Sequence, residues 1–337
     1  MKTINLKKKD IIKDLLFFKE SVKVYKKIKN KINPLKFQYF KFNKTKIIIA
    51  DDTSQILSSY KIRGSTNEIF ELDSKHKDIS LCTTGNFGLA ISYLCQKNKL
   101  SCNVFVPNFT SIAKIRKLEK YGAAVFSKNL NYDEAKKNAK LFAKKNKIKF
   151  LDTCTKNIYL GNASYVLNII EELKKKDKNF LRKKILAIFP LGNGSFALPS
   201  IKILKNLNKD INIALVEPSK FSKLFYYHCK KNKPNYSRSV ADGAAVKSLS
   251  KKKYKFFINN ADIISRASEM DIKKSMKFLK IKFGIKSEGA GALAMSFALL
   301  NKKKLNNYNY VIVPVCGSSI DDKKFFQIIK NIKELTF

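Results

Sequence analysis

Lys61 lies between a predicted strand and a predicted helix, in the segment SYKIRGS at residues 59–65. A lysine amine can act as a nucleophile and as a base when a largely dry site lowers its pKa. Lys61 is therefore the first candidate for a catalytic residue. The chain contains 69 Lys and Arg residues, so the plainer explanation of any single lysine is a solvated surface position.

Two further segments place hydroxyls or glycines at the predicted start of a helix. The first is TTGNFG at residues 83–88, whose hydroxyl and backbone N–H groups suit a carboxylate. The second is PLGNGSF at residues 190–196, where glycines let the backbone approach a phosphate. Each also has a simpler explanation, a Thr N-cap for the first and a tight turn for the second. The second is neither a Walker A loop nor a complete G-x-G-x-x-G.

Four more segments follow in order: V-E-P at 216–218, A-D-G-A-A-V at 241–246, S-E-G-A-G-A at 287–292 and V-C-G-S-S at 315–319. The ordered set resembles the fold-type II pyridoxal-phosphate enzymes, and within them the serine/threonine dehydratases and serine racemases. Those carry segments like S-F-K-x-R-G-A, S-S-G-N-H, G-G-G-G-L, V-E-P, A-D-G-x-A-V, E-P-x-G-A and a final S-G-G-N or C-G-G-S. The match covers roughly residues 30 to 320, and seven motifs in order are hard to explain by chance.

The resemblance implies pyridoxal 5'-phosphate as the cofactor. Lys61 matches the lysine that carries the cofactor and that takes the Cα proton of the substrate. The positions that match the phosphate cradle are Gly192, Asn193, Gly194 and Ser195.

The other matching positions surround the cofactor ring and the substrate. Asn86 matches the residue that bonds the ring oxygen, and Cys316 matches the Ser or Cys that faces the pyridine nitrogen. Glu288 and the backbone of Gly243 match residues that line the site, and we count Glu288 and Thr84 with Lys61 as candidate catalytic residues. The turn that would bind the substrate carboxylate contains Thr83, Thr84, Gly85, Asn86 and Phe87.

Cys316 bears on the type of reaction. A carboxylate at this position would hold the ring nitrogen protonated, whereas a thiol with an ordinary pKa of about 8.5 is neutral and cannot. The resulting carbanion is short-lived, which favours β-elimination over transamination. The resemblance thus implies a cytoplasmic lyase of amino-acid biosynthesis, in the isoleucine branch. It would convert L-threonine or L-serine to a 2-oxo acid and ammonia, with Lys61 as the base and the cofactor phosphate as the acid for the departing water.

Several positions depart from the family pattern. The cradle reads G-N-G-S, Phe87 replaces the usual His, Gly289 replaces a proline, and Thr84 replaces the serine of racemases. Thr84 keeps a hydroxyl, so racemisation is not excluded. The main alternative is a threonine synthase or another β- or γ-replacement enzyme with a phosphate-ester substrate. The segments Y-K-I-R-G-S and A-D-G-A-A-V favour the dehydratase. A non-catalytic relative is a third possibility.

The sequence predicts that the divalent metal site of the family is missing. That site uses a Glu, a backbone carbonyl four residues on and an Asp six residues on. Here Glu217 is followed by Phe221 and Lys223, and a cation at the Asp position should repel a metal ion.

Strand-like and helix-like segments alternate along the chain, which predicts an α/β fold with largely parallel sheets. Strands are expected at 46–50, 79–82, 102–107, 123–127, 184–190, 211–217 and 310–316. Helices are expected at 65–72, 85–97, 111–121, 132–146, 162–176, 197–207, 271–283 and 289–300. Residues 229–247 read as a polar surface excursion. The resemblance implies two interlocked three-layer domains of the tryptophan synthase beta-like type. Residues 1–80 and 160–337 would form the large cofactor-binding domain, and 81–159 the small substrate-gripping domain.

The formal net charge of +43 could indicate a nucleic-acid or anionic partner. Only five of the 69 basic residues are arginine, however, and Trp is absent while Lys, Asn, Ile and Phe are plentiful. These residues have A/T-rich codons, so genome bias explains the charge better than phosphate recognition, which relies on Arg. We therefore expect a small amino-acid substrate, no specific nucleic acid and no membrane partner. A homo-oligomer follows from the resemblance.

The six cysteines contain no CxxC pair, and no secretory signal is evident, which agrees with a cytoplasmic protein.

Overall fold

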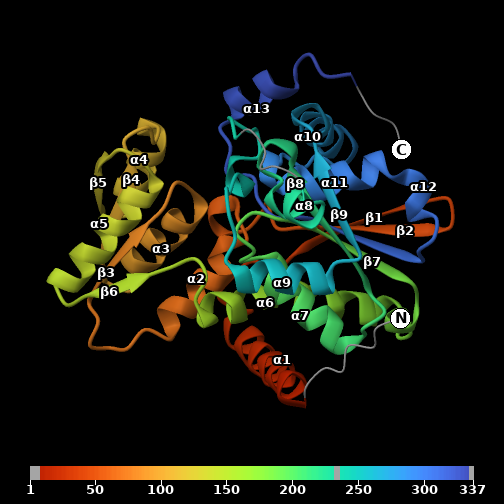
Figure 1. The fold of residues 1–337 in the computed structure, drawn as a ribbon, viewed down its shortest axis with the longest axis horizontal. Helices are drawn as coiled ribbons and strands as arrows, with labels where there is room; N and C mark the ends of the chain where they lie inside the picture. The colour runs from red at the N-terminus through yellow and green to blue at the C-terminus, as the bar shows by residue number, and fades with distance from the viewer. Residues whose placement is uncertain (1–7, 231–235, 334–337) are drawn as a thin grey trace.

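The computed structural model describes residues 8–230 and 236–333, and the side chains from residue 14 onward within these ranges. Two sheets organise the chain, a larger one on the right of Figure 1 and a smaller one on the left. None of the described helices is both long enough and apolar enough to cross a membrane.

The larger sheet has six strands in the order β1-β2-β10-β7-β8-β9. Only β1 runs antiparallel to its neighbour, while the other described pairs are parallel. The strands are β1 (Lys36–Phe42), β2 (Thr45–Asp51), β7 (Ile185–Pro190), β8 (Asn212–Pro218), β9 (Ile263–Ala267) and β10 (Tyr310–Val315).

The smaller sheet has four parallel strands in the order β5-β4-β3-β6. They are β3 (Asp78–Cys82), β4 (Ser101–Pro107), β5 (Ala123–Asn129) and β6 (Lys149–Leu151). The prediction of an α/β fold with mainly parallel sheets is therefore confirmed. We propose that the two sheets mark the two domains expected from the sequence, with residues 81–159 as the smaller one.

Helices cover both faces of each sheet, which gives three layers around each. On the larger sheet, α6 (Lys156–Lys176) and α7 (Ala197–Leu207) lie on one face, and α10 (Glu269–Phe283) and α11 (Gly289–Leu300) lie on the other. On the smaller sheet, α3 (Asn86–Lys97) and α5 (Tyr132–Lys145) take opposite faces. The remaining helices are α1 (Lys8–Ile28), α2 (Lys61–Phe70), α4 (Ile112–Lys120), α8 (Lys223–His228), α9 (Lys251–Asn260), α12 (Lys302–Leu305) and α13 (Asp322–Ile329).

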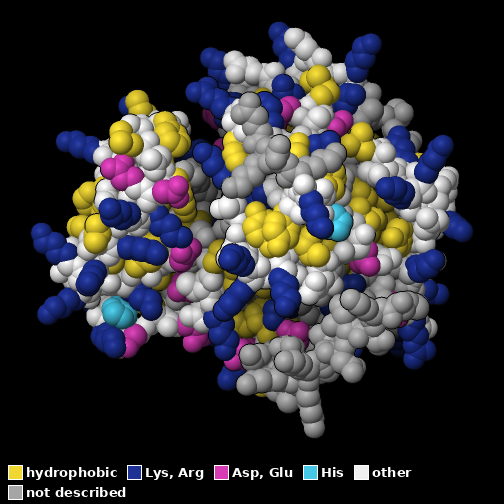
Figure 2. Space-filling view, viewed as in Figure 1, with side chains coloured by type: hydrophobic (Ala, Val, Ile, Leu, Met, Phe, Trp, Pro, Cys, Tyr) yellow, Lys and Arg dark blue, Asp and Glu magenta, His cyan; other side chains and the backbone are white. Residues whose placement is uncertain are grey.

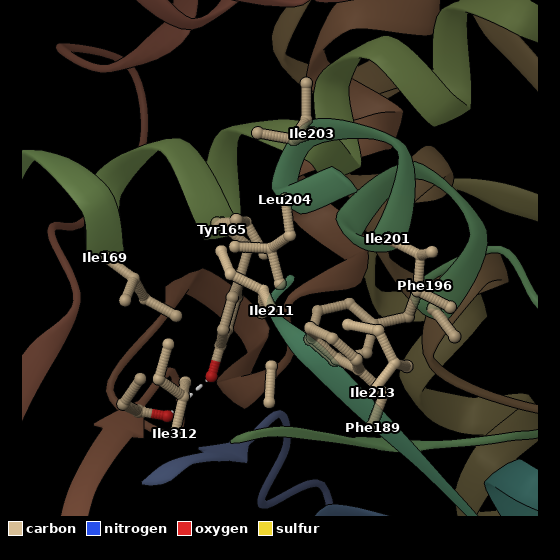
Figure 3. Packing of buried hydrophobic residues seen from close by; sticks show 14 of the residues in the cluster. Tyr165, Ile169, Phe189, Phe196, Ile201, Ile203, Leu204, Ile211, Ile213 and Ile312 are labelled. Carbon is tan, nitrogen blue, oxygen red and sulfur yellow. Dashed lines mark hydrogen bonds between the residues drawn. The ribbon is translucent and has the colours of Figure 1, made fainter. Parts of the chain in front are cut away.

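Strand β2 shows how the sequence builds these layers. Successive side chains of a strand point to opposite faces of the sheet. The unbroken apolar run Ile47–Ala50 therefore places apolar side chains on both faces. Ile48 and Ala50 pack into the cluster under α6 and α7, and Ile47 and Ile49 pack into the cluster under α11. All four are fully buried. Figure 3 shows the first cluster, where rings and branched side chains from α6, α7 and the sheet interlock.

Most predicted elements are confirmed to within a few residues, with three differences. The helix expected at 65–72 begins four residues earlier, so Lys61 is its first residue. The helix expected from 162 begins at Lys156, where the Thr155 side chain accepts the N–H of Ile158 as an N-cap. The elements that were not predicted are helices α1, α8, α9, α12 and α13 and strands β1, β6 and β9. Residues 231–235 of the expected surface excursion lie outside the described residues.

Candidate active site

Two of the predicted motifs follow parallel neighbouring strands at the same edge of the larger sheet. The glycine loop begins after β7, and Cys316 follows β10, which pairs with β7. Ligands bind at this carboxyl edge in open parallel sheets, because loops and helix N-termini converge there. The shared edge brings together segments more than 100 residues apart in the chain.

Backbone hydrogen bonds place Lys61 beside the end of β10. The N–H of Tyr60 donates to the carbonyl of Cys316 at 3.0 Å, and Ser59 forms an antiparallel bridge with Gly317. The turn before them uses Leu57 at φ 62° and Ser58 at φ 53°, a left-handed conformation that is rare for a branched residue such as Leu. Strained backbone of this kind clusters at functional sites, where the surrounding structure maintains it. Here the turn delivers Lys61 to the first position of α2.

The glycine loop has the properties of an anion site. Within the described residues, no hydrogen bond uses the backbone N–H groups of Gly192, Asn193 or Gly194, and these precede the N-terminus of α7. Gly194 has φ +84°, and a Cβ there would lie 2.8 Å from the Phe257 ring. A Cβ on Gly192 would meet the backbone of residues 243 and 244 at 3.1–3.2 Å. The loop therefore requires glycine at position 194 and leaves little room for a side chain at 192. It also presents free donors where a helix dipole favours a phosphate.

Lys61 points to this loop. Its Nζ donates to Ser195 Oγ at 2.9 Å, across 134 residues of sequence. The structure thus brings together the predicted cofactor lysine and the last residue of the predicted cradle. A lysine in reach of a phosphate-sized loop fits a phosphorylated carbonyl cofactor.

The side chain of Asn193 bonds to neighbouring residues of the loop region. Its Oδ1 accepts the N–H of Ser195 at 2.9 Å, and its Nδ2 donates to Thr153 Oγ1 at 2.9 Å. The Nζ of Lys253 in turn donates to the Asn193 carbonyl at 2.6 Å. The Asn193 side chain therefore supports the loop from within, and it does not point outward as an additional donor.

Sequence reasoning missed Asn162, which links the Lys61 segment to the glycine loop. Its Oδ1 accepts the N–H of Gly64 at 3.0 Å, and its Nδ2 donates to the carbonyl of Ser195 at 2.8 Å. It is fully buried within α6. A buried amide in the apolar part of a helical segment was the available signal, since such groups need partners elsewhere in the fold.

Asn86 and Glu288 meet across the gap between the two sheets. The Nδ2 of Asn86, the first residue of α3, lies 3.0 Å from Glu288 Oε1 and 3.3 Å from Oε2. Glu288 is half-buried, and burial, with a smaller contribution from the negative charge of Asp242, raises the pKa of its carboxyl group to about 7. Glu288 can therefore hold or release a proton near neutral pH.

Cys316 is a buried thiol at the end of β10, with 6% of its surface exposed. Burial raises the pKa of the thiol well above its ordinary value, and the nearby Glu288 adds to this effect. Its Sγ lies 4.0 Å from the carbonyl of Ala290. The side chain is thus neutral in the pH range of most enzymes.

The turn before α3 divides its side chains between interior and solvent. Thr83 Oγ1 accepts the N–H groups of Gly85 at 3.2 Å and Gly88 at 3.1 Å, so this hydroxyl braces the turn itself. Thr84 is exposed, and Phe87 is buried in the cluster of the smaller sheet. The turn therefore presents the Thr84 side chain to solvent and keeps the ring of Phe87 in the interior.

Two ion pairs flank these groups. Lys114 of α4 pairs with Asp242 at 3.2 Å, next to Gly243, and this exposed contact spans the two sheets. Glu217 pairs with Lys223 at 3.0 Å, and both side chains are at most 1% exposed. The ammonium group of Lys223 occupies the surroundings of the Glu217 carboxylate, where the sequence led us to expect no metal ion.

A lysine that bonds a glycine loop with free N–H groups, at the carboxyl edge of a parallel sheet, is an arrangement that fits a phosphorylated carbonyl cofactor. Residues 33–317 match the family model described as "Pyridoxal-phosphate dependent enzyme", and the chain belongs to this family. Its cofactor is accordingly pyridoxal 5'-phosphate, and the fold is the type II fold of these enzymes, tryptophan synthase beta-like.

Individual relatives are distant. The catabolic L-threonine dehydratase TdcB of Staphylococcus aureus is 25% identical over 307 residues, which cover 88% of this chain and 86% of the relative. Among solved structures, maize serine racemase has a TM-score of 0.80 at 16% identity and covers 93% of this chain and 96% of its own. Threonine deaminase isoform 2 of Solanum lycopersicum has a TM-score of 0.79 at 18% identity, with 98% and 90% covered. At these identities the structural neighbours establish the fold alone.

Proposed function

We propose that the protein is an ammonia-lyase that converts L-threonine or L-serine to a 2-oxo acid and ammonia by β-elimination. The observation that carries this proposal is the neutral thiol of Cys316 beside the Lys61 segment. Without a carboxylate at this position, charge that develops at Cα is held only briefly, and prompt loss of a β-hydroxyl becomes the favoured outcome. The name of the S. aureus relative, a catabolic L-threonine dehydratase, supports the same reaction.

The residues near Lys61 would bind the cofactor and remove the substrate proton. Bound pyridoxal phosphate supplies a conjugated ring that withdraws electrons from the substrate and makes its Cα–H acidic. The free N–H groups at 192–194 and the hydroxyl of Ser195 would hold the phosphate, and Lys61 would be the point of attachment. The Nζ of Lys61 would be the base that takes the Cα proton of the substrate.

The polar groups on the other side of the site orient the substrate. Thr84 and the backbone of Gly85 would receive the substrate carboxylate at the start of α3, where the helix dipole favours an anion. Asn86, bonded to Glu288, would bond the ring oxygen of the cofactor. Glu288, with a pKa near 7, can carry a proton beside Lys61 during the reaction.

The test begins with an absorbance spectrum of the purified protein, taken after addition of pyridoxal phosphate and before and after L-threonine. We expect a band near the visible edge that borohydride abolishes, followed by formation of 2-oxobutyrate. Lys61→Ala should lack the band, whereas Lys75→Ala, at a surface side chain 70% exposed, should keep it. Absence of any 2-oxo acid from threonine and from serine would refute the lyase assignment.

A second candidate is a threonine synthase acting on a phosphate ester. Asn193 favours it, because the start of the loop, Gly192-Asn193, is similar to the G-N-x-G loop of those enzymes, although Ser195 stands at the last position. The discriminating assay is release of phosphate from O-phosphohomoserine, which the lyase should not catalyse. A non-catalytic relative would give neither product while still binding the cofactor.

The proposed partners follow from the site and the surface. Lys and Arg side chains are scattered over the face in Figure 2 and do not gather in one stripe, which supports genome bias over a nucleic-acid site. We therefore propose a small amino-acid substrate and no specific nucleic acid. The family resemblance supports the proposal of a homo-oligomer, and the unpaired cysteines support that of a cytoplasmic location. Weak binding of DNA and RNA at physiological salt, and a mass above 38.6 kDa in sedimentation, are the expected results.

A further inference from the structure

Tyr60 carries a hydroxyl that the proposed reaction does not use. Its ring is 9% exposed and packs 4.7 Å, centroid to centroid, from Phe196, which belongs to the core cluster of Figure 3. The Nζ of Lys61 lies 4.8 Å from the centroid of the Tyr60 ring. The hydroxyl lies 3.3 Å from Ser195 Oγ. Tyr60 therefore contacts both the predicted cofactor lysine and the predicted cradle.

The rest of Ser195 is already fixed by neighbours. Asn193 Oδ1 binds its N–H at 2.9 Å, and Asn162 Nδ2 binds its carbonyl at 2.8 Å. Only the direction of the Ser195 O–H bond remains free to change. This direction decides whether the hydroxyl donates into the loop or elsewhere.

The donors around Ser195 Oγ determine that direction. A serine hydroxyl has one proton to donate and two lone pairs to accept with, whereas a lysine ammonium only donates. Lys61 fills one lone pair at 2.9 Å, and the Tyr60 O–H can fill the other at 3.3 Å. With both lone pairs occupied, the Ser195 proton is left for an anion in the loop. Two incoming hydrogen bonds also polarise this hydroxyl, which makes it a better donor.

We propose that Tyr60 is a positioning residue that aims the Ser195 hydroxyl at the cofactor phosphate. Its part is largest once Lys61 has turned from Ser195 to bond the cofactor, because Tyr60 is then the remaining donor to Ser195 Oγ. This inference rests on the proposed role of Ser195 as a phosphate ligand. A net contribution typical of one hydrogen bond corresponds to about 2- to 10-fold in cofactor affinity.

The test measures cofactor affinity in Tyr60→Phe, which keeps the ring and its packing and removes only the hydroxyl. Equilibrium titration with pyridoxal phosphate should show about 2- to 10-fold weaker binding than in wild type. Pyridoxal, which lacks the phosphate, should bind both proteins equally. Tyr165→Phe is the matched control, because the Tyr165 ring also packs on Phe196 while its hydroxyl bonds the carbonyl of Ala50 and not Ser195.

A double-mutant cycle separates this role from a general structural one. If Tyr60 acts through Ser195, adding Tyr60→Phe to Ser195→Ala should change the dissociation constant of pyridoxal phosphate by less than about 2-fold. Equal losses for pyridoxal and pyridoxal phosphate, or additive losses in the cycle, would overturn the proposal, as would an unchanged affinity of Tyr60→Phe. None of these readouts requires turnover, so failure of the lyase assignment would be seen separately.

Discussion

The carboxyl group of Glu288 should make the stability of the protein depend on pH. Its pKa in the folded chain is about 7, against 4.5 as the ordinary value. The folded state therefore holds this proton more tightly than the unfolded state, and folding loses stability as pH rises from about 4.5 through about 7. The two values differ by about 2.5, and each tenfold change in proton affinity is worth about 1.4 kcal/mol. Because Glu288 is only half-buried, we expect a penalty of about 2 to 3 kcal/mol above pH 7.

Glu288→Gln removes the ionisable group and keeps the shape and a partner for Asn86. Urea unfolding of the cofactor-free protein at pH 5, 6, 7 and 8 gives the free energy of unfolding of both proteins. The free energy of unfolding of the variant should rise relative to that of wild type as pH rises, by about 2 to 3 kcal/mol between pH 5 and pH 8. The control is Glu119→Gln on the exposed face of α4, where the difference should change little with pH.

If the difference in free energy of unfolding between wild type and Glu288→Gln stayed constant from pH 5 to pH 8, Glu288 would not titrate in this range. That result would refute the reasoning. A difference of opposite sign would mean that the neighbouring positive charges outweigh burial. The pH profile of kcat/KM supplies an independent check, since an ionisation near pH 7 should disappear in the variant.

Three further predictions concern the same region. Gly194→Ala should destabilise the chain by about 1 to 3 kcal/mol in urea unfolding, because φ is +84° and the new Cβ would press on Phe257; an unchanged midpoint would contradict this. Arg63→Met should cost about 3 to 5 kcal/mol, because Arg63 and Asp52 form a pair 2.7 Å apart with side chains at most 1% exposed, and the buried carboxylate would lose its only cationic partner among the described residues. A smaller loss would show that water reaches Asp52. Cys316→Ser exchanges one neutral group for another and should keep 2-oxobutyrate formation within about 10-fold of wild type; a complete loss would show that the thiol itself is needed.

Local patterns were sufficient for most of the fold. The runs that form β2, β7, β8 and β10 are short, apolar and bounded by turn residues, so they indicated buried parallel strands. The elements that were missed lack this signal. In β1, polar side chains interrupt the apolar ones and only partial burial results, which is typical of an edge strand. In α9 the first three residues are lysines, and only Phe257 is buried.

The motifs named candidate residues for the site, but they did not indicate how those residues bond to one another. Motif order indicated Lys61, the glycine loop and Cys316. It did not indicate Asn162, which is recognisable only by its bonds to Gly64 and Ser195. Nor did it indicate that Asn193 would turn inward to support the loop, since that depends on Thr153 and Lys253, far away in sequence.

The sequence by itself determined the alternation of strands and helices, the chemical groups available and their order along the chain. These follow from side-chain periodicity and backbone preference, which act over a few residues. The tertiary structure decided which groups meet: Lys61 with Ser195 across 134 residues, and Asn86 with Glu288 across 202. It also decided the pKa of Glu288, because desolvation depends on the elements that close over a carboxyl group.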